Sequence, residues 1–328
     1  MKSIAKTLII LLILVLLFGG TVLLLISQNL LFPPTVQERD PVPIPTDAPV
    51  AVFAAEPVET APQPQPEIPE LSATRYFAYD VREGTYLAKL GESNEMLYPA
   101  SITKLLTAYV VLQYLRPEDT VVVGDALDLV AEDSSVAGLA VGDRLTTTQL
   151  LSAMMLPSGN DAAQAAAVAV GRIIAGNSNL SSEQAVAVFV DEMNAQAQAM
   201  GMTDSHFENP DGYHHDNHFT TMDDLVVLCQ KVLAEPVLLD CTSRVADTVV
   251  VSGRTLQWQN TNLLLDSSSD VYLPNTIGRK TGYTGKAGSC LISAFFMEDR
   301  IWLIGVFGCP AFTEDRYLDT IAIYNSLL

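Results

Sequence analysis

The chain is poor in basic residues and in cysteine, and each scarcity excludes a class of function. Its 328 residues include 18 lysines and arginines against 38 aspartates and glutamates, which gives a formal net charge of −20 at pH 7. Nucleic-acid binding needs basic patches that neutralise phosphates, so this balance argues against DNA or RNA as a partner. The four cysteines form no C-x-x-C pair, and a zinc-ribbon interpretation therefore has no support.

Two of the four cysteines, Cys290 and Cys309, have a spacing that suggests a link. The segments 291–297 and 301–307 are predicted strands on either side of a turn at 298–300. A hairpin centred on that turn would place the two cysteines opposite each other, near bridging distance. A disulfide and two buried free thiols are both consistent with the sequence.

The first 32 residues predict a membrane segment. Residues 7–27 form an uncharged run dominated by leucine, isoleucine and valine, which is long enough to cross a bilayer as a helix. Lys2 and Lys6 precede the run, and no positive charge follows until Arg39. This asymmetry favours a single-pass anchor with the rest of the chain outside the cell membrane. A cleaved signal peptide, which would release a secreted protein, is the alternative.

The remainder divides into a spacer and a folded domain. Residues 33–72 are rich in proline, which favours an extended stalk and cannot supply a packed core. Residues 73–328 alternate helical and strand patterns, with strands at both ends of the domain and helices between them. We therefore expect an α+β fold in which N- and C-terminal strands share a mainly antiparallel sheet. The central helices would form a separate lobe, with a cleft between sheet and lobe as the natural site.

The element boundaries follow from periodicity, caps and turn residues. Strands are predicted at 75–80, 85–90, 248–251, 255–260, 280–283, 290–297 and 301–307. Helices are predicted at 102–115, 148–155, 161–174, 182–200, 221–233 and 314–328. Ser181 and Gln184 have the spacing of a capping box at the start of the helix 182–200.

A serine and a lysine at the start of one predicted helix form the first candidate motif. Ser101 and Lys104 are three residues apart and so share a helix face. A serine hydroxyl is a poor nucleophile and needs a base beside it. Lys104 has apolar neighbours, and burial together with a second cation, Lys280, would lower its pKa towards that role. The alternative is a helix-capping serine and a surface lysine.

Two further motifs follow in order along the chain. Ser158 and Asn160 lie in a break between helices, where short polar side chains can relay a proton or cap the next helix. Lys280, Thr281 and Gly282 lie on a predicted strand. The lysine and threonine can bind a carboxylate, and glycine lets another backbone approach the strand closely. An edge-strand lysine that deters aggregation is the alternative.

Three basic residues are clustered near the third motif despite the acidic background. They are Arg279, Lys280 and Lys286. We interpret this cluster as a candidate anion-binding site.

In combination, the S-x-x-K, S-x-N and K-T-G motifs are those of the penicillin-binding and serine β-lactamase superfamily. The surrounding segments resemble more narrowly the serine D-alanyl-D-alanine carboxypeptidases, which are low-molecular-mass penicillin-binding proteins. The resemblance covers about residues 73–328 and is carried by 96–107, 155–163, 193–202, 207–212, 218–225, 260–264 and 278–284. It implies the β-lactamase/transpeptidase-like fold, a peptidoglycan stem peptide as substrate, β-lactams as covalent inhibitors, and no cofactor.

The resemblance also implies catalytic roles. Ser101 would attack the carbonyl of the penultimate D-alanine, and Lys104 would take its proton. Ser158 would help to pass that proton to the leaving D-alanine, and Asn160 would position the substrate.

The third motif would bind the substrate. Lys280 and Thr281 would hold the terminal carboxylate, next to Gly282. The backbone N–H groups of Ser101 and Tyr283 would form the oxyanion hole.

The chain departs from the family pattern in two places. Several relatives have histidine where this chain has Tyr283, which preserves the backbone donor but changes the side chain. Many relatives also have a C-terminal β-rich domain and a C-terminal anchor, whereas this sequence ends one helix after its last predicted strand. The N-terminal helix would then replace the missing anchor.

Three alternative functions remain open. In a serine β-lactamase the second motif is usually Ser-Asp-Asn, whereas Gly159 stands at the middle position here. A D,D-endopeptidase would use the same residues on cross-bridges. A wall-binding protein with a degenerate site is the non-enzyme alternative. The sequence does not decide the growth stage of action or the oligomeric state.

Four histidines occur in one polar segment and raise the question of a metal. They are His206, His214, His215 and His218. No H-E-x-x-H pattern accompanies them, and a flexible loop seldom preorganises a metal site. We therefore expect no metal and a structural role for His218.

Overall fold

The computed structural model of this protein describes residues 66–328. The predicted anchor at 1–32 and most of the predicted stalk at 33–72 lie outside the described residues. Among the residues described, no helix is both long enough and apolar enough to cross a membrane.

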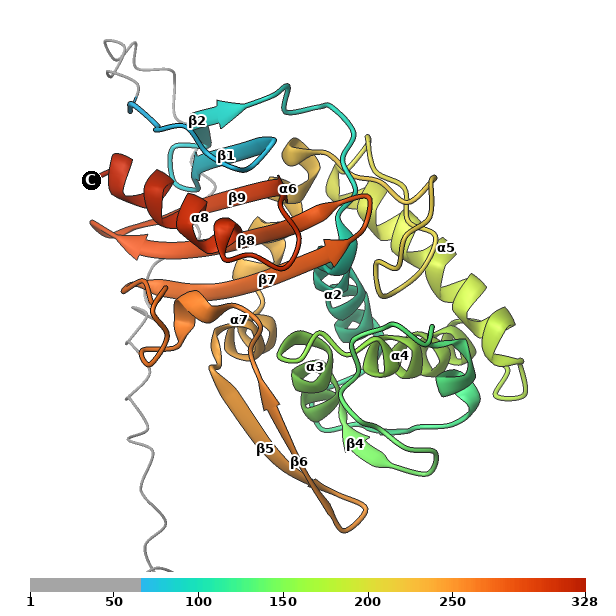
Figure 1. Cartoon of the computed structure of the whole chain (residues 1–328). Coiled ribbons are helices and arrows are strands. Elements are labelled where there is room, and N and C mark those ends of the chain that lie inside the picture. Colours follow the sequence, from blue (N-terminus) through green and yellow to red (C-terminus); the bar gives the residue numbers. More distant parts are fainter. Residues whose placement is uncertain (1–65) are drawn as a thin grey trace, which may run out of the picture. The chain divides into compact units, whose positions relative to one another are not determined.

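Within residues 66–328, the largest sheet has five antiparallel strands in the order β2-β1-β9-β8-β7 (Figure 1). Its strands are β1 (Arg75–Asp80), β2 (Thr85–Leu90), β7 (Thr276–Thr284), β8 (Gly288–Met297) and β9 (Arg300–Cys309). The N-terminal hairpin joins the C-terminal strands through β1 and β9, as the sequence predicted. Phe77 pairs with Gly305 across that junction. A Cβ on Gly305 would lie 2.4 Å from the Phe77 ring, so glycine makes room for the ring.

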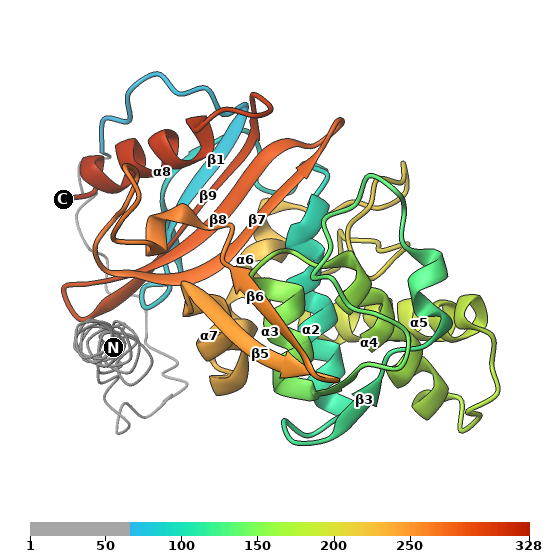
Figure 2. The same cartoon turned by 60° about the horizontal axis from the view of Figure 1, so that its bottom comes forward.

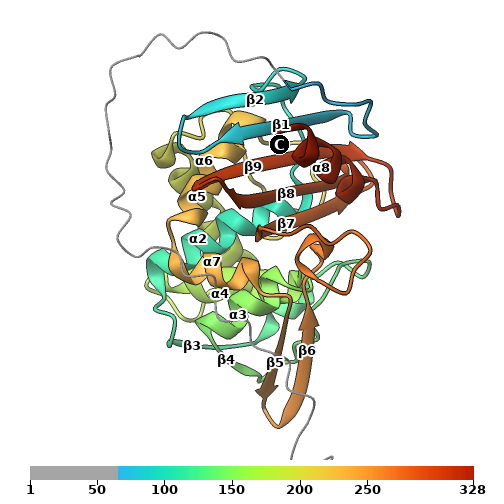
Figure 3. The same cartoon turned by 90° about the vertical axis from the view of Figure 1, so that its left-hand side faces the viewer.

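Helices cover both faces of this sheet. They are α2 (Lys104–Tyr114), α3 (Thr147–Met155), α4 (Asn160–Ile174), α5 (Ser182–Met200), α6 (Met222–Leu233), α7 (Pro236–Ser243) and α8 (Asp315–Ser326). Side chains alternate along the strands and therefore build two hydrophobic clusters. The cluster under α8 contains Ala78, Ile304 and Tyr324. The other contains Phe77 and Leu303 and continues into the helical lobe. Figure 3 shows this lobe, with α3, α4 and α7, below β7.

The helical lobe lies beside the β7 edge of the sheet (Figure 2). A short 3-10 helix, η1 (Ala100–Thr103), leads into α2 and packs directly against β7. Because β7 is the last strand of the sheet, its outer edge faces the region between sheet and lobe. This arrangement confirms the predicted α+β fold, with an antiparallel sheet and a helical lobe.

Several short elements were not predicted from the sequence. They are η2 (Asp125–Leu129), η3 (Leu263–Leu265), the pair β3 (Thr120–Val122) and β4 (Arg144–Thr146), and helix α7. A longer hairpin of β5 (Ala246–Val251) and β6 (Arg254–Gln259) projects from the lobe (Figure 1). Its two strands were predicted at 248–251 and 255–260, but their pairing was not. Three-residue strands carry too little alternation to be recognised. Helix α7 has only eight residues and begins at Pro236, a residue that is tolerated at the first position of a helix.

Packing begins a few residues before Ala73. Ile68 and Leu71 pack partly buried against the cluster under α8. The backbone N–H groups of Ser72 and Ala73 both donate to the carboxylate of Asp319 in α8. The start of the folded unit is therefore tied to its last helix.

The two C-terminal cysteines are not opposite each other. Cys290 and Cys309 are both free and buried. The turn at Glu298 and Asp299 sets a register that pairs Ser289 with Cys309, and a bulge follows between Ser289 and Leu291. Cys290 therefore packs into the lobe-side cluster and Cys309 into the cluster under α8. Because the predicted register was wrong, the structure favours the free-thiol alternative.

Candidate active site

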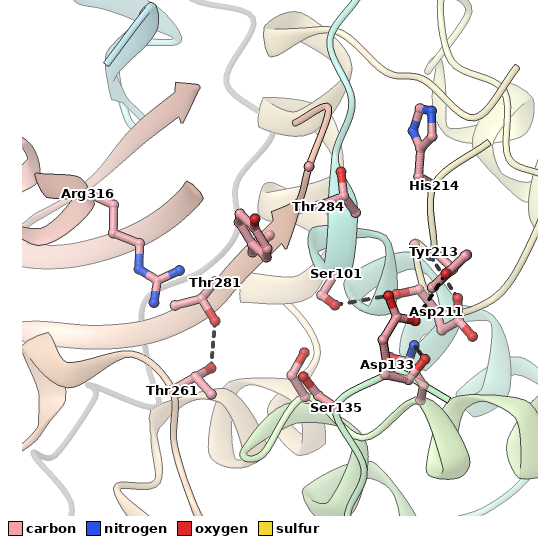
Figure 4. A pocket seen from close by; sticks show the side chains of 17 residues that line it. Ser101, Asp133, Ser135, Asp211, Tyr213, His214, Thr261, Thr281, Thr284 and Arg316 are labelled. Carbon is pink, nitrogen blue, oxygen red and sulfur yellow. Dashed lines mark hydrogen bonds between the residues drawn. The ribbon is translucent and has the colours of Figure 1, made fainter. Parts of the chain in front are cut away.

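A pocket of about 450 Å³ opens where β7, η1 and the helical lobe meet (Figure 4). It is lined by Ser101, Asp133, Ser134, Ser135, Ser158, Asn160, Asp211, Gly212, Tyr213, His214, Thr261, Thr281, Gly282, Tyr283, Thr284, Gly285 and Arg316. All three sequence motifs contribute to this lining. The cleft expected between sheet and lobe is therefore present.

Ser101 and Lys104 are in direct contact. Ser101 lies in η1, and Lys104 is the first residue of α2, with no exposed surface. The Lys104 ammonium donates to Ser101 Oγ at 2.8 Å, to Asn160 Oδ1 at 2.7 Å and to the Asp211 carbonyl at 2.7 Å. These three bonds use every donor of an ammonium group. The alternative of a surface lysine is wrong for Lys104.

Burial changes the acid–base chemistry of this lysine. Desolvation lowers the pKa of Lys104 to about 8, against the opposing effect of the Asp211 and Asp161 carboxylates. Burial is the largest cause of this shift, and the repulsion between Lys104 and Lys280 that the sequence suggested is expressed in the lowered pKa of Lys280. A neutral lysine has a lone pair, and Ser101 Oγ is near enough to give it a proton.

The second motif is part of the same network. Asn160 is the first residue of α4; its Oδ1 accepts from Lys104, and its Nδ2 donates to Ser134 Oγ at 2.9 Å. Ser158 is 6% exposed and has a left-handed backbone, with φ of 62°. Among residues 66–328, no hydrogen bond is formed by its hydroxyl. Strained backbone of this kind is concentrated at functional sites. Since Ser158 also lines the pocket, its hydroxyl is available to a ligand there.

The third motif lies along the edge strand β7. Lys280 is 1% exposed, and its Nζ donates to the Thr281 carbonyl at 3.1 Å. Burial holds the pKa of Lys280 well below its usual value, with further lowering by the Lys104 and Arg316 cations. Thr281 Oγ1 lies 2.6 Å from Thr261 Oγ1 on the pocket wall (Figure 4). Tyr283 follows at the pocket edge and is 40% exposed.

Close backbone contacts explain the glycines at the site. A Cβ on Gly282 would lie 2.9 Å from the Pro99 carbonyl and 3.2 Å from the Ser101 nitrogen. A Cβ on Gly212, whose φ is 80°, would lie 1.9 Å from the Ala100 carbonyl. The backbone that approaches Gly282 in this structure is that of η1. The contact brings the Ser101 N–H group against β7, beside Tyr283.

Sequence reasoning missed three groups that complete the site. Arg316 from α8 lines the pocket, and its buried Nε has no hydrogen-bond partner within the described chain (Figure 4). The Asp211 carbonyl is the third acceptor for Lys104, and Thr261 binds Thr281. A backbone carbonyl has no sequence signal, and Arg316 lies 36 residues after Lys280. The match of the segment 260–264 to the family was the one available signal for Thr261.

The predicted basic cluster does not form a single anion site. Arg279 is 1% exposed and donates to Thr242 Oγ1 of α7 at 3.2 Å. Lys286 is exposed in the turn between β7 and β8. Consecutive side chains of a strand point to opposite faces, so Arg279 and Lys280 are separated by the strand itself.

His218 is a buried structural residue. It is 2% exposed, and burial lowers its pKa to about 3, so the ring stays neutral. Its Nδ1 accepts from the Glu208 N–H at 3.2 Å, which leaves Nε2 to donate to Thr103 Oγ1 at 2.8 Å. Thr103 lies two residues after Ser101 and directly before Lys104, so the bond fixes this turn. In the part of the chain that the structure describes, no three His, Cys, Asp or Glu side chains are grouped to hold a metal.

Known proteins support the family resemblance that the sequence motifs indicated. The family model for D-alanyl-D-alanine carboxypeptidases (peptidase S11) matches residues 59–307. The D-alanyl-D-alanine carboxypeptidase DacD of Escherichia coli is 33% identical over 271 residues, or 79% of this chain and 63% of the relative. DacF of Bacillus subtilis is 29% identical over 62% of this chain and 49% of its own length. The chain therefore spans between about half and two thirds of these two relatives.

Solved structures with the same fold include a shorter relative. The DD-transpeptidase of Streptomyces K15 superposes with a TM-score of 0.71 at 29% identity, covering 79% of this chain and 98% of the other. A D-alanyl-D-alanine carboxypeptidase from Mycobacterium tuberculosis has a TM-score of 0.68 at 28% identity, with 82% and 97% covered. The fold is thus that of the DD-transpeptidases. By the extent of the family match, the chain belongs to the D-alanyl-D-alanine carboxypeptidase family.

Proposed function

We propose that this protein is a serine D-Ala-D-Ala carboxypeptidase that removes the terminal D-alanine of peptidoglycan stem pentapeptides. The observation that carries the proposal is the contact between Lys104 Nζ and Ser101 Oγ, with the lysine side chain fully buried. It supplies a nucleophile and a base that is partly neutral at physiological pH.

Acylation starts with proton transfer from Ser101 to neutral Lys104. Ser101 Oγ attacks the penultimate carbonyl, and the Ser101 and Tyr283 N–H groups receive the negative charge on the carbonyl oxygen. The C–N bond then breaks, and Ser158, which lines the same pocket as Ser101, passes the proton to the leaving amine. Water hydrolyses the ester and returns Ser101 to its resting state. Transfer to an amine instead of water would be transpeptidation.

The terminal carboxylate of the substrate has a cationic wall to bind. Thr281 lies on this wall, and Arg316 projects towards it from α8 (Figure 4). The unpartnered Nε of Arg316 and the poorly satisfied Lys280 ammonium both gain from an anion. A guanidinium binds a carboxylate through paired hydrogen bonds. The substrate is therefore oriented with its C-terminus towards α8.

The site also predicts slow release of β-lactams. Fast deacylation needs a carboxylate that holds a water molecule on the acyl-serine. Within residues 66–328, no carboxylate oxygen bonds to Ser101 or Lys104. The Asp211 carboxylate is occupied by Gln164 Nε2 and the Tyr213 N–H group, and only its carbonyl faces Lys104. This arrangement favours a carboxypeptidase over a β-lactamase.

We place the catalytic unit outside the cytoplasmic membrane, where stem peptides are found. This part of the proposal rests on the sequence of residues 1–39 alone, through the apolar run and the lysines before it. Protease added to intact cells would degrade the domain if it is exported. Membrane fractionation would then separate an uncleaved anchor from a secreted form.

The decisive experiment is D-alanine release by the full-length protein in detergent. With a stem pentapeptide ending in D-Ala-D-Ala, we expect free D-alanine and no cleavage of cross-linked dimers. Penicillin should give one long-lived adduct on Ser101, seen by mass spectrometry of the peptide. Ser101→Ala should abolish both, whereas Ser243→Ala, the same change at the partly buried C-terminal end of α7, should not. D-alanine release by Ser101→Ala, or rapid penicillin turnover by the native protein, would contradict the proposal.

A further inference from the structure

Two aromatic residues, Tyr283 and Phe312, form a pair at the edge of the pocket, and neither side chain has a role in the proposed reaction. Tyr283 follows the K-T-G motif, and its ring lies 5.1 Å from that of Phe312, with 53° between the ring planes. Phe312 belongs to the loop between β9 and α8. Its side chain is 91% exposed, the largest exposed fraction among the large hydrophobic residues of the described chain.

Phe312 is held in an unfavourable state in the free protein. Its φ of 59° is a left-handed conformation that side chains beyond Gly, Asn and Asp rarely adopt. The ring is also left in water, and its contact with Tyr283 is the one ring contact it makes among residues 66–328. Strained residues of this kind are concentrated at ligand-binding sites. The strain and the exposure of Phe312 therefore point to a preformed ligand-binding surface.

The direction of side chains along β7 shows which part of a substrate would meet this pair. Gly282 faces η1, because a Cβ there would contact Ser101. Side chains alternate, so Thr281 and Tyr283 project from the opposite face. Thr281 lines the carboxylate wall of the pocket together with Arg316. Arg316, the second residue of α8, lies four residues after Phe312, so the aromatic pair borders the same end of the pocket.

We propose that Tyr283 and Phe312 form a subsite for the side chain of the terminal D-residue. The inference rests on the proposed carboxypeptidase reaction and specifies its substrate class. Two aromatic rings present far more apolar surface than the methyl group of alanine can cover. The enzyme therefore also releases terminal D-residues with large apolar side chains, such as D-leucine and D-phenylalanine. The bonds broken and formed are unchanged, since the same C–N bond is cleaved and only the leaving amino acid differs.

The test compares peptides that differ only in the last residue. Stem pentapeptides ending in D-Ala-D-Ala, D-Ala-D-Leu and D-Ala-D-Phe are given to the full-length protein, and kcat/KM is measured for each. We expect the D-Phe to D-Ala ratio of kcat/KM to fall about three- to tenfold in Phe312→Ala, the range of one aromatic contact. Phe312→Leu, which keeps apolar area without a ring, should lie between the two.

Phe296→Ala is the matched control, because it makes the same change at a half-exposed site near the β8–β9 turn. It should leave the ratio as in the native protein. An unchanged ratio in Phe312→Ala, or a native enzyme that rejects both large residues, would overturn the inference while D-alanine release stands. Absence of D-alanine release from the native enzyme would instead refute the proposed function.

Discussion

The pH dependence of turnover gives the sharpest test of Lys104 as the base. Burial lowers the pKa of Lys104 to about 8, so its neutral form becomes common within the physiological range. At pH 7 about one molecule in eleven then has neutral Lys104, against about one in 3,000 for an ordinary lysine. The rate of a reaction that needs the neutral form must follow this fraction.

The shape of the profile separates a buried base from an ordinary lysine. With a pKa near 8, kcat should rise roughly fiftyfold between pH 6 and pH 8 and only about twofold between pH 8 and pH 10. An unperturbed lysine would give a further rise of roughly 75-fold over the second interval. The measurement is D-alanine release at saturating peptide. Saturation matters because the pKa of Lys280 is lowered as well, and loss of its charge would weaken carboxylate binding.

Asp211→Asn tests the direction in which a nearby charge shifts the pKa of Lys104. The Asp211 carboxylate raises the pKa of Lys104, so removing its charge should move the rise in kcat to lower pH. The substitution can be accommodated, because Gln164 Oε1 has no partner now and can accept from the new amide after a flip of the Gln164 side chain. A kcat that keeps rising tenfold above pH 8.5, or a shift of the Asp211→Asn profile to higher pH, would refute the assignment.

Three further outcomes follow from named contacts. Arg316→Leu should raise KM for the pentapeptide about tenfold or more with a smaller change in kcat, because its guanidinium would bind the ground-state carboxylate. Asp161→Asn should lower the free energy of unfolding by about 2 kcal/mol in urea denaturation, since the Asp161 carboxylate accepts N–H bonds from Ala137, Gly138 and Leu139. Phe312→Gly should stabilise the fold by up to about 1 kcal/mol, because glycine removes the strain of the left-handed backbone. The same change should reduce the preference for large terminal residues. A lower melting temperature would count against strain at this position.

Local sequence signals were sufficient for the long elements. The bounds of β1, β2 and α5 agree with the prediction residue for residue. At α5 the reason is chemical: Ser181 and Gln184 form the capping box, and Gly201 ends the helix with a φ of 95°. Each signal lies within a few residues of the boundary that it sets. Strands β7, β8 and β9 were placed correctly but are longer than predicted, because pairing extends them past their apolar runs.

Contacts distant in sequence escaped prediction. The Cys290 and Cys309 pairing depended on a register, and a bulge beside Ser289 cannot be read from hairpin symmetry. Arg279 was grouped with Lys280 by sequence proximity, yet the strand separates their side chains. Arg316 was overlooked, because its role depends on how α8 crosses the sheet. The motifs thus indicated the chemistry of the site. Which charged groups surround it could be read only from the folded structure.

The burial that makes Lys104 a base also destabilises the folded state, because a charged lysine is costly in a buried position. The folded state lowers the pKa of Lys104 from 10.5 to about 8, so the unfolded chain binds more protons between those values and stability rises with pH across that window. Below pH 8 the charged lysine costs the fold roughly 3 kcal/mol, from 2.5 pKa units at 1.36 kcal/mol each. Lys280 adds a cost of the same sign. A substrate carboxylate next to Lys280 and Arg316 would supply the missing negative charge, so the destabilised cationic wall becomes part of the driving force for binding.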